Sequence, residues 1–303
     1  MQTQRFVKEG DGFRLISPAA DLVAFLSGPL AESASGYRAA IDAFRSRYGS
    51  ALHWWRGTNM KRMRKADTRL WETVEAAFGD QLDEEDIELL VCSGPTSRDA
   101  ITPAFEATYY AEPDACGLIR LTLPVTDNDA KNGATLMELA SAAFADVQLT
   151  WGYGGYSLYW NPVDVEIADE APDIVGPWLL RHPGFAYGDP GDHVFHASKG
   201  LIDVNWLTFL GPALAAKLGG QQVLSKNAPS GVRVGMIGHD KVMLQAGDVP
   251  ATGDVNRKDL LPLYAAVGHL VTGARPPREI LDEVTVLGVG EDRRELWLDR
   301  FFS

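Results

Sequence analysis

The sequence predicts an α+β protein in which antiparallel or mixed β-sheets carry helices packed on one side. Several stretches rich in β-branched and aromatic residues alternate apolar with polar positions, which is the pattern of strands. Other stretches repeat apolar residues every three or four positions, which is the pattern of amphipathic helices. Hydrophobic residues make up 46% of the 303 residues, which is enough to fill a large core.

The first half of the chain predicts a group of strands that is preceded and followed along the chain by helices. In TRLWETVEAAF, Leu70, Val74 and Ala77 share one helical face. FEATYYA and GLIRLTLPV alternate and are rich in β-formers. LTWGYGGYSLYW predicts an aromatic strand or a hairpin that turns at Gly154–Gly155, whereas residues 12–26 only mix apolar and polar positions around Pro18. The predicted elements are helices over 36–48, 68–78 and 135–147, strands over 87–93, 105–111 and 117–125, and the aromatic segment over 149–160.

The second half predicts shorter elements with well-marked ends. Pro212 suits the first position of a helix that Gly219 and Gly220 then close. In TGDVN, Asp254 and Asn256 are expected to cap the following helix or to order the turn before it. The predicted elements are a short helix over 175–180, a loop over 184–199, a strand over 200–210, a helix over 212–218, a hairpin over 232–245, a helix over 260–271 and a strand over 283–287.

The stretch GLIDVNWLTFLGPALAAKLGG is nearly all apolar, yet it contains Asp203, Asn205 and Trp206. As a catalytic pair, the two polar residues would lack a nucleophile or base nearby. Their side chains can instead satisfy neighbouring backbone donors. We therefore expect all three residues to be buried or half-buried parts of the core.

A weak internal repeat bears on the number of domains. GLIRLTLPV, followed by a helix and a strand, resembles GLIDVNWLTFL, followed by a helix and strands. Two related lobes, over 1–165 and 166–303, would explain the repeat, and chance similarity of two buried strands explains it equally well. We expect one domain over 1–303 in either case.

The negative charge is concentrated in the middle of the chain. Residues 71–180 hold 3 Lys and Arg against 21 Asp and Glu, a net charge of −18, while the whole chain carries −13. A negative charge of this size repels nucleic acid and anionic membranes and attracts basic partners, or it serves solubility alone. The N-terminus shows no apolar stretch typical of a secretory signal, so a cytoplasmic location is expected.

Few residues suggest catalysis or metal binding. The chain contains no nucleotide-binding, serine-hydrolase or zinc-protease motif, and Cys92 and Cys116 fall in apolar stretches as buried residues would. The segment GDPGDHVFHASKG predicts a solvated loop. Its imidazoles and carboxylates leave open a metal-dependent hydrolase as an alternative. The four candidate ligands are Asp189, Asp192, His193 and His196.

An acidic run and a set of aromatic residues predict a protein interface. LDEEDIE is too crowded for two distinct acid and base roles, but it suits contact with a basic partner. Aromatic anchors beside a charged rim are typical of interfaces. The predicted contact residues are Asp83, Glu84, Glu85, Asp86, Tyr153 and Tyr156.

Three stretches in order, LLRHPGFAYGD, GLIDVNWLTFLGPALAAKLGG and AGDVPATGDVNRKDLLPLYAAVGHL, resemble the bacterial type VI secretion immunity family. Members of that family protect a cell from a cognate nuclease effector of the VRR-NUC type. The resemblance implies an antitoxin without enzymatic activity or cofactor. It would bind a basic toxin and would contact neither nucleic acid nor membrane. An adaptor of the secretion apparatus is the remaining alternative.

Overall fold

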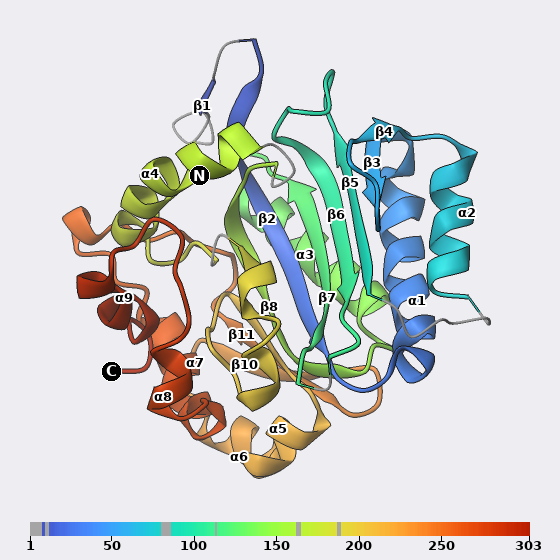
Figure 1. Cartoon of the computed structure of the whole chain (residues 1–303). Helices are drawn as coiled ribbons and strands as arrows, with labels where there is room; N and C mark the ends of the chain where they lie inside the picture. The colour runs from blue at the N-terminus through green and yellow to red at the C-terminus, as the bar shows by residue number, and fades with distance from the viewer. Residues whose placement is uncertain (1–7, 10–11, 80–85, 113, 162–164, 187–188) are drawn as a thin grey trace.

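One antiparallel sheet contains every strand of the described residues, from Lys8 to Ala246, and together with the helices it confirms the α+β prediction (Figure 1). The computed structural model describes residues 8–9, 12–79, 86–112, 114–161, 165–186 and 189–303. The strand order in the described residues is β10-β11-β9-β8-β2-β7-β6-β5-β3-β4, and β1 pairs with β2. The strands are β1 (Lys8–Glu9), β2 (Arg14–Leu26), β3 (Trp54–Gly57), β4 (Arg64–Lys65), β5 (Ile87–Ser93), β6 (Ile101–Tyr109), β7 (Gly117–Pro124), β8 (Leu149–Tyr159), β9 (Leu207–Leu210), β10 (Val232–Ile237) and β11 (Lys241–Ala246).

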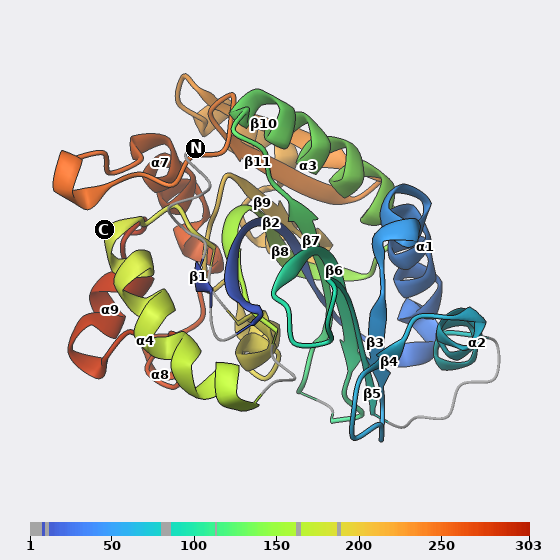
Figure 2. The same ribbon diagram turned by 90° about the horizontal axis from the view of Figure 1, so that it is seen from above.

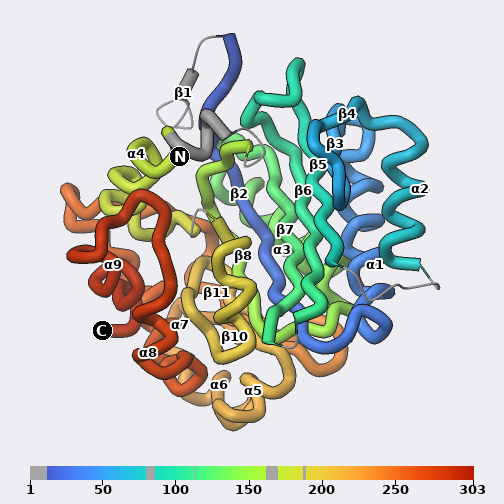
Figure 3. Tube along the Cα trace, in the orientation of Figure 1, coloured from blue at the N-terminus to red at the C-terminus, as the bar shows by residue number. Residues whose placement is uncertain are grey.

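Helices cover both sides of this sheet (Figure 2). α1, α2 and α3 lie on one side, and α4, α8 and α9 lie on the other, so the helices are not confined to one side as predicted. The tube in Figure 3 shows that the C-terminal segment with α8 and α9 runs beside α4. The helices are α1 (Leu30–Tyr48), α2 (Thr68–Ala77), α3 (Asp129–Ala143), α4 (Val165–Arg181), α5 (Pro212–Lys217), α6 (Gly220–Asn227), α7 (Pro262–Val271), α8 (Arg278–Leu281) and α9 (Glu291–Leu298), with 3-10 turns η3 (Pro190–His193) and η4 (Ala197–Lys199).

The central strand is β2, which the sequence pattern did not predict. It pairs with β7 from Ala19 to Leu26 and with β8 from Ser17 to Leu26. Its residues are buried on both faces, so they show no clean alternation. Pro18 lies just beyond the segment that pairs with β7 and lies opposite Leu158 of β8.

The face of the sheet toward α1 and α3 forms the main core. Phe44 of α1 meets Phe105 of β6 edge-on, with ring centroids 5.8 Å apart. Tyr37 stacks on Phe78 at 4.6 Å, and its hydroxyl donates to the carbonyl of Thr108 at 2.6 Å. Because side chains alternate along β6, burying Phe105, Ala107 and Tyr109 on this face turns Glu106 and Thr108 to the opposite face.

The aromatic segment forms the single strand β8, which confirms the strand alternative, whereas the hairpin that turns at Gly154–Gly155 is wrong. Its glycines instead allow close approach of neighbouring groups. A Cβ on Gly155 would lie 1.8 Å from Oδ1 of Asn205, and one on Gly152 would lie 2.2 Å from the carbonyl oxygen of Val23. The segment needs glycine for space between layers rather than for a change of chain direction.

We predict that Gly155→Ala will lower the free energy of unfolding by about 1–3 kcal/mol, because the added methyl group displaces the Asn205 side chain. Gly235→Ala is the matched control, since it also lies in a strand and its Cβ would meet only Cε of Met243, at 3.9 Å. Urea denaturation of both variants checks this. Equal stability of the two variants would contradict the packing argument.

Two further predicted strands differ in the structure. The predicted strand over 283–287 is turn and irregular backbone, and the predicted strand over 200–210 shortens to β9. In the irregular part before β9, the Asp203 carboxylate accepts from the backbone N–H of Val204 at 2.8 Å. Oδ1 of Asn205 accepts from the N–H of Trp206 at 2.7 Å. These local bonds replace the sheet ladder over residues 203–206.

Candidate functional site

A shallow groove crosses β5 and β6 on the face of the sheet opposite α1. It encloses about 100 Å³ and is lined by Arg56, Glu88, Leu89, Leu90, Glu106, Thr108 and Tyr110. We call it the Glu106 groove. Strand register explains its composition, because Glu88 pairs with Thr108 and Leu90 pairs with Glu106. The side chains that alternate away from the α1 core therefore converge in one polar row.

A buried ion pair forms the inner end of this row. Arg120 of β7 lies opposite Glu106 in the strand register. It donates from Nε and Nη2 to Oδ2 of Asp21 on β2, at 3.0 and 2.8 Å. The side chains of Arg120 and Asp21 are 4% and 0% exposed. The guanidinium is thus committed to Asp21, and no ion pair between Arg120 and Glu106 forms within 4 Å.

Two carboxyl groups at the groove have raised pKa values. Burial, and then the charge of Asp189, raise the pKa of Glu106 to about 7. Burial, and then the charge of Asp192, raise the pKa of Asp189 to about 6. The Arg120 guanidinium opposes both shifts without overcoming them. Both carboxyl groups are therefore desolvated, and the buried cation that acts on them is already paired with Asp21.

Thr108 and two aromatic rings complete the surroundings of the groove. Thr108 lines it, and the buried Thr108 hydroxyl has no hydrogen-bond partner among the described residues. Tyr110 contacts Phe195 with ring centroids 5.5 Å apart, and Phe195 is 45% exposed. Asp86 lies at the start of β5, where its carboxylate accepts from the N–H of Ala111 at 2.9 Å. The groove therefore has polar walls and an exposed aromatic lip.

The predicted contact residues lie in different places. Asp83, Glu84 and Glu85 fall outside the described residues, whereas Asp86 is exposed. Tyr153 and Tyr156 are each 1% exposed, so their side chains offer no surface to a partner in this fold. The Tyr156 hydroxyl bonds to the Asp129 carboxylate and thereby ties β8 to α3. The exposed aromatic lip of Tyr110 and Phe195 was not predicted as such.

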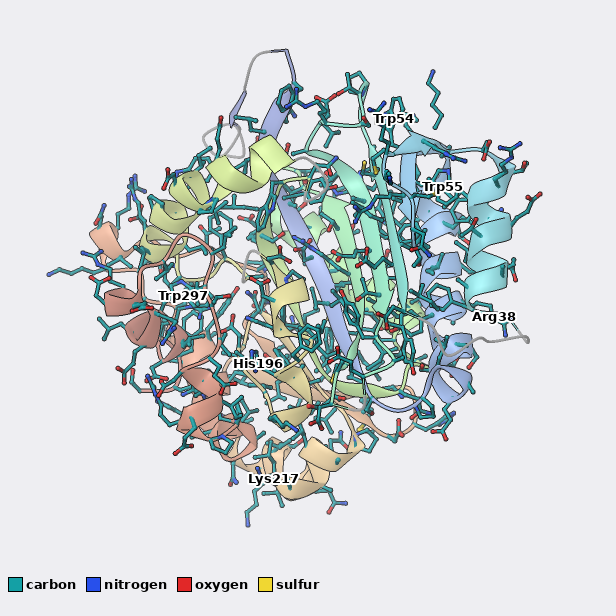
Figure 4. The ribbon with its side chains drawn as sticks, viewed as in Figure 1. Arg38, Trp54, Trp55, His196, Lys217 and Trp297 are labelled. Atoms are coloured by element: carbon teal, nitrogen blue, oxygen red, sulfur yellow. The ribbon has the colours of Figure 1, made fainter. Side chains whose placement is uncertain are left out.

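The segment over 189–199 is an ordered cover on the sheet, so the predicted solvated loop is wrong. The carbonyl of Val194 accepts from the N–H of Cys116 at 2.8 Å, and the carbonyl of Ala197 accepts from Nε1 of Trp151 at 3.1 Å. Figure 4 labels His196 in front of the sheet. These contacts explain why η3 and η4 pack onto the sheet rather than projecting into solvent.

The four candidate metal ligands point to different neighbours. His193 is fully buried, and burial lowers its pKa to about 3. Asp192 accepts from the Thr285 hydroxyl at 3.2 Å, and Nδ1 of His196 lies 3.9 Å from Glu283. Asp189 accepts from the N–H of Gly191 at 3.0 Å. Within the described ranges, no group of three or more His, Cys, Asp or Glu side chains is arranged to hold a metal ion.

The polar residues around 203–206 are buried and bonded. Asp203 pairs with Arg300 near the C-terminus, Oδ2 to Nη2, at 2.8 Å. Asn205 donates from Nδ2 to the carbonyl of Gly184 at 3.3 Å. Nε1 of Trp206 donates to the carbonyl of Gly247 at 3.2 Å. These residues hold together segments that are distant in sequence.

The remaining motif residues order turns. Gly219 and Gly220 have φ values of 86° and 78°, which suit glycine between α5 and α6. The Asp254 carboxylate accepts from the N–H of Asn256 at 3.1 Å and pairs with Arg181 at 3.1 Å. Asp254 therefore orders the short 3-10 turn over 255–257 and connects it to the end of α4.

A second cavity lies at the edge of the sheet near β3 and encloses about 700 Å³. Its lining includes Leu52, Trp54, Ile101 and Pro103, together with Lys65. Figure 4 labels Trp54 at this edge. The lining contains no carboxylate, so the cavity lacks the acid–base pairs and the negative charge that the Glu106 groove has.

Comparison with known proteins gives a family and a fold. The family model TsiV, described as Type VI immunity for VRR-NUC, matches residues 37–301. No curated protein matches the sequence. The structure is similar to that of the Pseudomonas aeruginosa T6SS protein PA0821, with a TM-score of 0.80 and 18% sequence identity, over 98% of this chain and 87% of that chain. At this identity the structural likeness shows a shared fold.

Proposed function

The chain belongs to the TsiV family of type VI immunity proteins for VRR-NUC, and from this premise we propose that it binds a cognate effector nuclease and blocks its active site or nucleic-acid groove. The family match over residues 37–301 carries the proposal. The role requires a complementary surface rather than catalysis, and we infer that the chain has no enzymatic activity of its own.

Charge supports this form of inhibition. A nuclease presents basic residues to the phosphates of its substrate. An inhibitor that occupies the same surface gains affinity and association rate when it is acidic. Residues 71–180 carry a net charge of −18, and they include Glu88 and Glu106 of the groove. The inhibitor would thus meet the effector through the surface that the effector uses for nucleic acid.

We place this encounter in the cytoplasm, where a nuclease would reach nucleic acid. Of the helices that the structure describes, none combines the length and the apolar character needed to cross a membrane. We propose neither a membrane nor a nucleic acid as a direct partner, because the acidic middle segment would repel both.

Co-expression with the product of the adjacent gene in the source genome tests the proposal. We expect that product alone to stop growth, and this chain to restore growth and to co-purify with it in a fixed ratio. The matched control is an unrelated acidic protein at the same level. Toxicity that this chain neither relieves nor binds would contradict the proposed function.

The acidic run before β5 gives a second test, which concerns the route of association. We predict that reversing Asp83, Glu84, Glu85 and Asp86 to lysine will slow association on the order of tenfold at low salt, because long-range attraction is lost. Stopped-flow mixing at two salt concentrations measures this. The control reverses four exposed acids elsewhere: Glu279, Glu283, Glu291 and Asp292. Equal slowing in both variants would assign the effect to net charge rather than to this segment.

A further inference from the structure

We propose that the Glu106 groove receives one basic side chain of the partner, with its cationic end at Glu106 and its stem against Tyr110 and Phe195. The inference rests on the proposed function, since the partner is the effector. The inference specifies that the Glu106 groove contacts the effector. It also specifies that a lysine or arginine of the effector occupies the groove.

The first argument is the uncompensated charge at the groove. Seven titratable groups line the groove or act on Glu106 through their charge. They are Arg56 of β3, Glu88 of β5, Glu106 of β6, Tyr110 just after it, Arg120 of β7, Asp21 of β2 and Asp189 beside η3, and the charge of Asp192 acts in turn on Asp189. Arg120 is committed to Asp21, and Arg56 lies 3.5 Å from Glu88. Glu106 and Asp189 therefore form no ion pair among the described residues, and the charge of Arg120 offsets theirs only in part.

The second argument is an unused hydrogen-bonding group in the same place. Thr108 is 6% exposed and lines the groove, and its buried hydroxyl has no hydrogen-bond partner within the described part of the chain. Buried hydroxyl groups normally find a partner. An ammonium or guanidinium group of a bound side chain carries several N–H donors and could satisfy both Thr108 and a carboxylate.

The third argument is the aromatic lip. Tyr110 borders Glu88 and Glu106, and it contacts the exposed ring of Phe195. Lysine and arginine bury their methylene stems against apolar surface while their charged ends reach polar groups. Guanidinium groups also lie favourably over aromatic rings. The lip and the carboxylates thus match the two ends of one basic side chain.

The proposal implies a defined pH dependence. Glu106, with a pKa of about 7, and Asp189, with a pKa of about 6, are partly protonated in the free protein near pH 6. A bound cation favours their ionised forms, so binding releases protons. Affinity should therefore rise between pH 6 and pH 8, and removing the Glu106 carboxylate should reduce that rise.

The closing experiment compares Glu106→Gln with Glu75→Gln in binding to the adjacent-gene product. Glu75 is exposed on α2, which lies on the opposite side of the sheet. We expect the Glu106 variant to bind about tenfold or more weakly at pH 8 and with a flatter pH dependence, as expected for a desolvated charge pair. The Glu75 variant should bind like the unmodified chain. Equal affinity of the two variants for the effector would overturn the proposal.

A second arm does not depend on the identity of the effector. N-acetyl-arginine methylamide is titrated at millimolar concentration into protein carrying ¹³C-labelled glutamate carboxyls, with N-acetyl-citrulline methylamide as the neutral control. The Glu106 resonance, assigned by its loss in Glu106→Gln, should move only with the arginine compound. If the resonance moves with the arginine compound while no effector complex forms, the proposed function fails but the proposal that the groove binds a basic side chain is supported. If the two compounds have the same effect, that proposal is wrong.

Discussion

Replacing Asp203 by alanine is expected to lower the free energy of unfolding by about 3–5 kcal/mol, because it leaves a buried guanidinium without its carboxylate. The side chains of Arg300 and Asp203 are 8% and 3% exposed, and Nη2 lies 2.8 Å from Oδ2. Arg300 would retain only carbonyl acceptors, from Pro183 at 2.9 Å and Trp297 at 3.0 Å. Urea denaturation with linear extrapolation measures the loss.

Two variants test that explanation for Asp203. Asp203→Asn keeps one acceptor oxygen, for either Arg300 or the N–H of Val204, whereas alanine keeps none, so it should lose less stability than the alanine variant. Asp282→Ala breaks an exposed pair with Arg278 and should change stability by less than about 1 kcal/mol. If Asp203→Ala were no more destabilising than Asp282→Ala, the buried pair would not be the reason that Asp203 matters.

Local sequence patterns were reliable where neighbouring residues alone decide the structure. β5 has the predicted bounds, Ile87–Ser93, and α2 ends one residue earlier than predicted. The hairpin of β10 and β11 around Gly238–Asp240 also agrees. In each case the regular spacing of apolar residues and the turn residues lie within the element itself.

The sequence patterns gave wrong predictions where residues distant in the sequence determine the local structure. β2 is buried on both faces by strands and helices from elsewhere in the chain, so its sequence does not alternate. Gly155 looked like a turn residue, because nothing in the sequence shows that Asn205 fills the space where its Cβ would be. Residues 203–206 are rich in β-formers, but side-chain bonds to the local backbone replace the ladder there.

The groove could be predicted only in part. Alternation in FEATYYA places Glu106 and Thr108 on one face of a strand, and Arg120 interrupts an apolar run in GLIRLTLPV. Both are signals of a polar face. That Glu106 meets Arg120 depends on the register of β6 and β7, and that Asp189 approaches them depends on the packing of η3. Neither relation can be read from local spacing.

The last prediction concerns Glu106 and the stability of the free protein. Its folded pKa of about 7 lies above the value of about 4.3 expected in an unfolded chain. The folded state therefore holds the proton more tightly, and this stabilisation is complete below the unfolded pKa and is lost as pH rises through about 7. We expect Glu106→Gln to match the unmodified protein near pH 4 and to be more stable at pH 8 by about 1–3 kcal/mol.

Urea denaturation at pH 4, 6 and 8 in constant salt measures this difference, with Glu75→Gln as the control whose pH dependence should follow that of the unmodified protein. Parallel curves for the two variants would show that the Glu106 carboxylate is not desolvated in the folded state. The carboxylate that destabilises the free protein at neutral pH is the one that a bound cation would stabilise. The same substitution should therefore strengthen the fold and weaken the complex, an opposition that general damage to the structure would not produce.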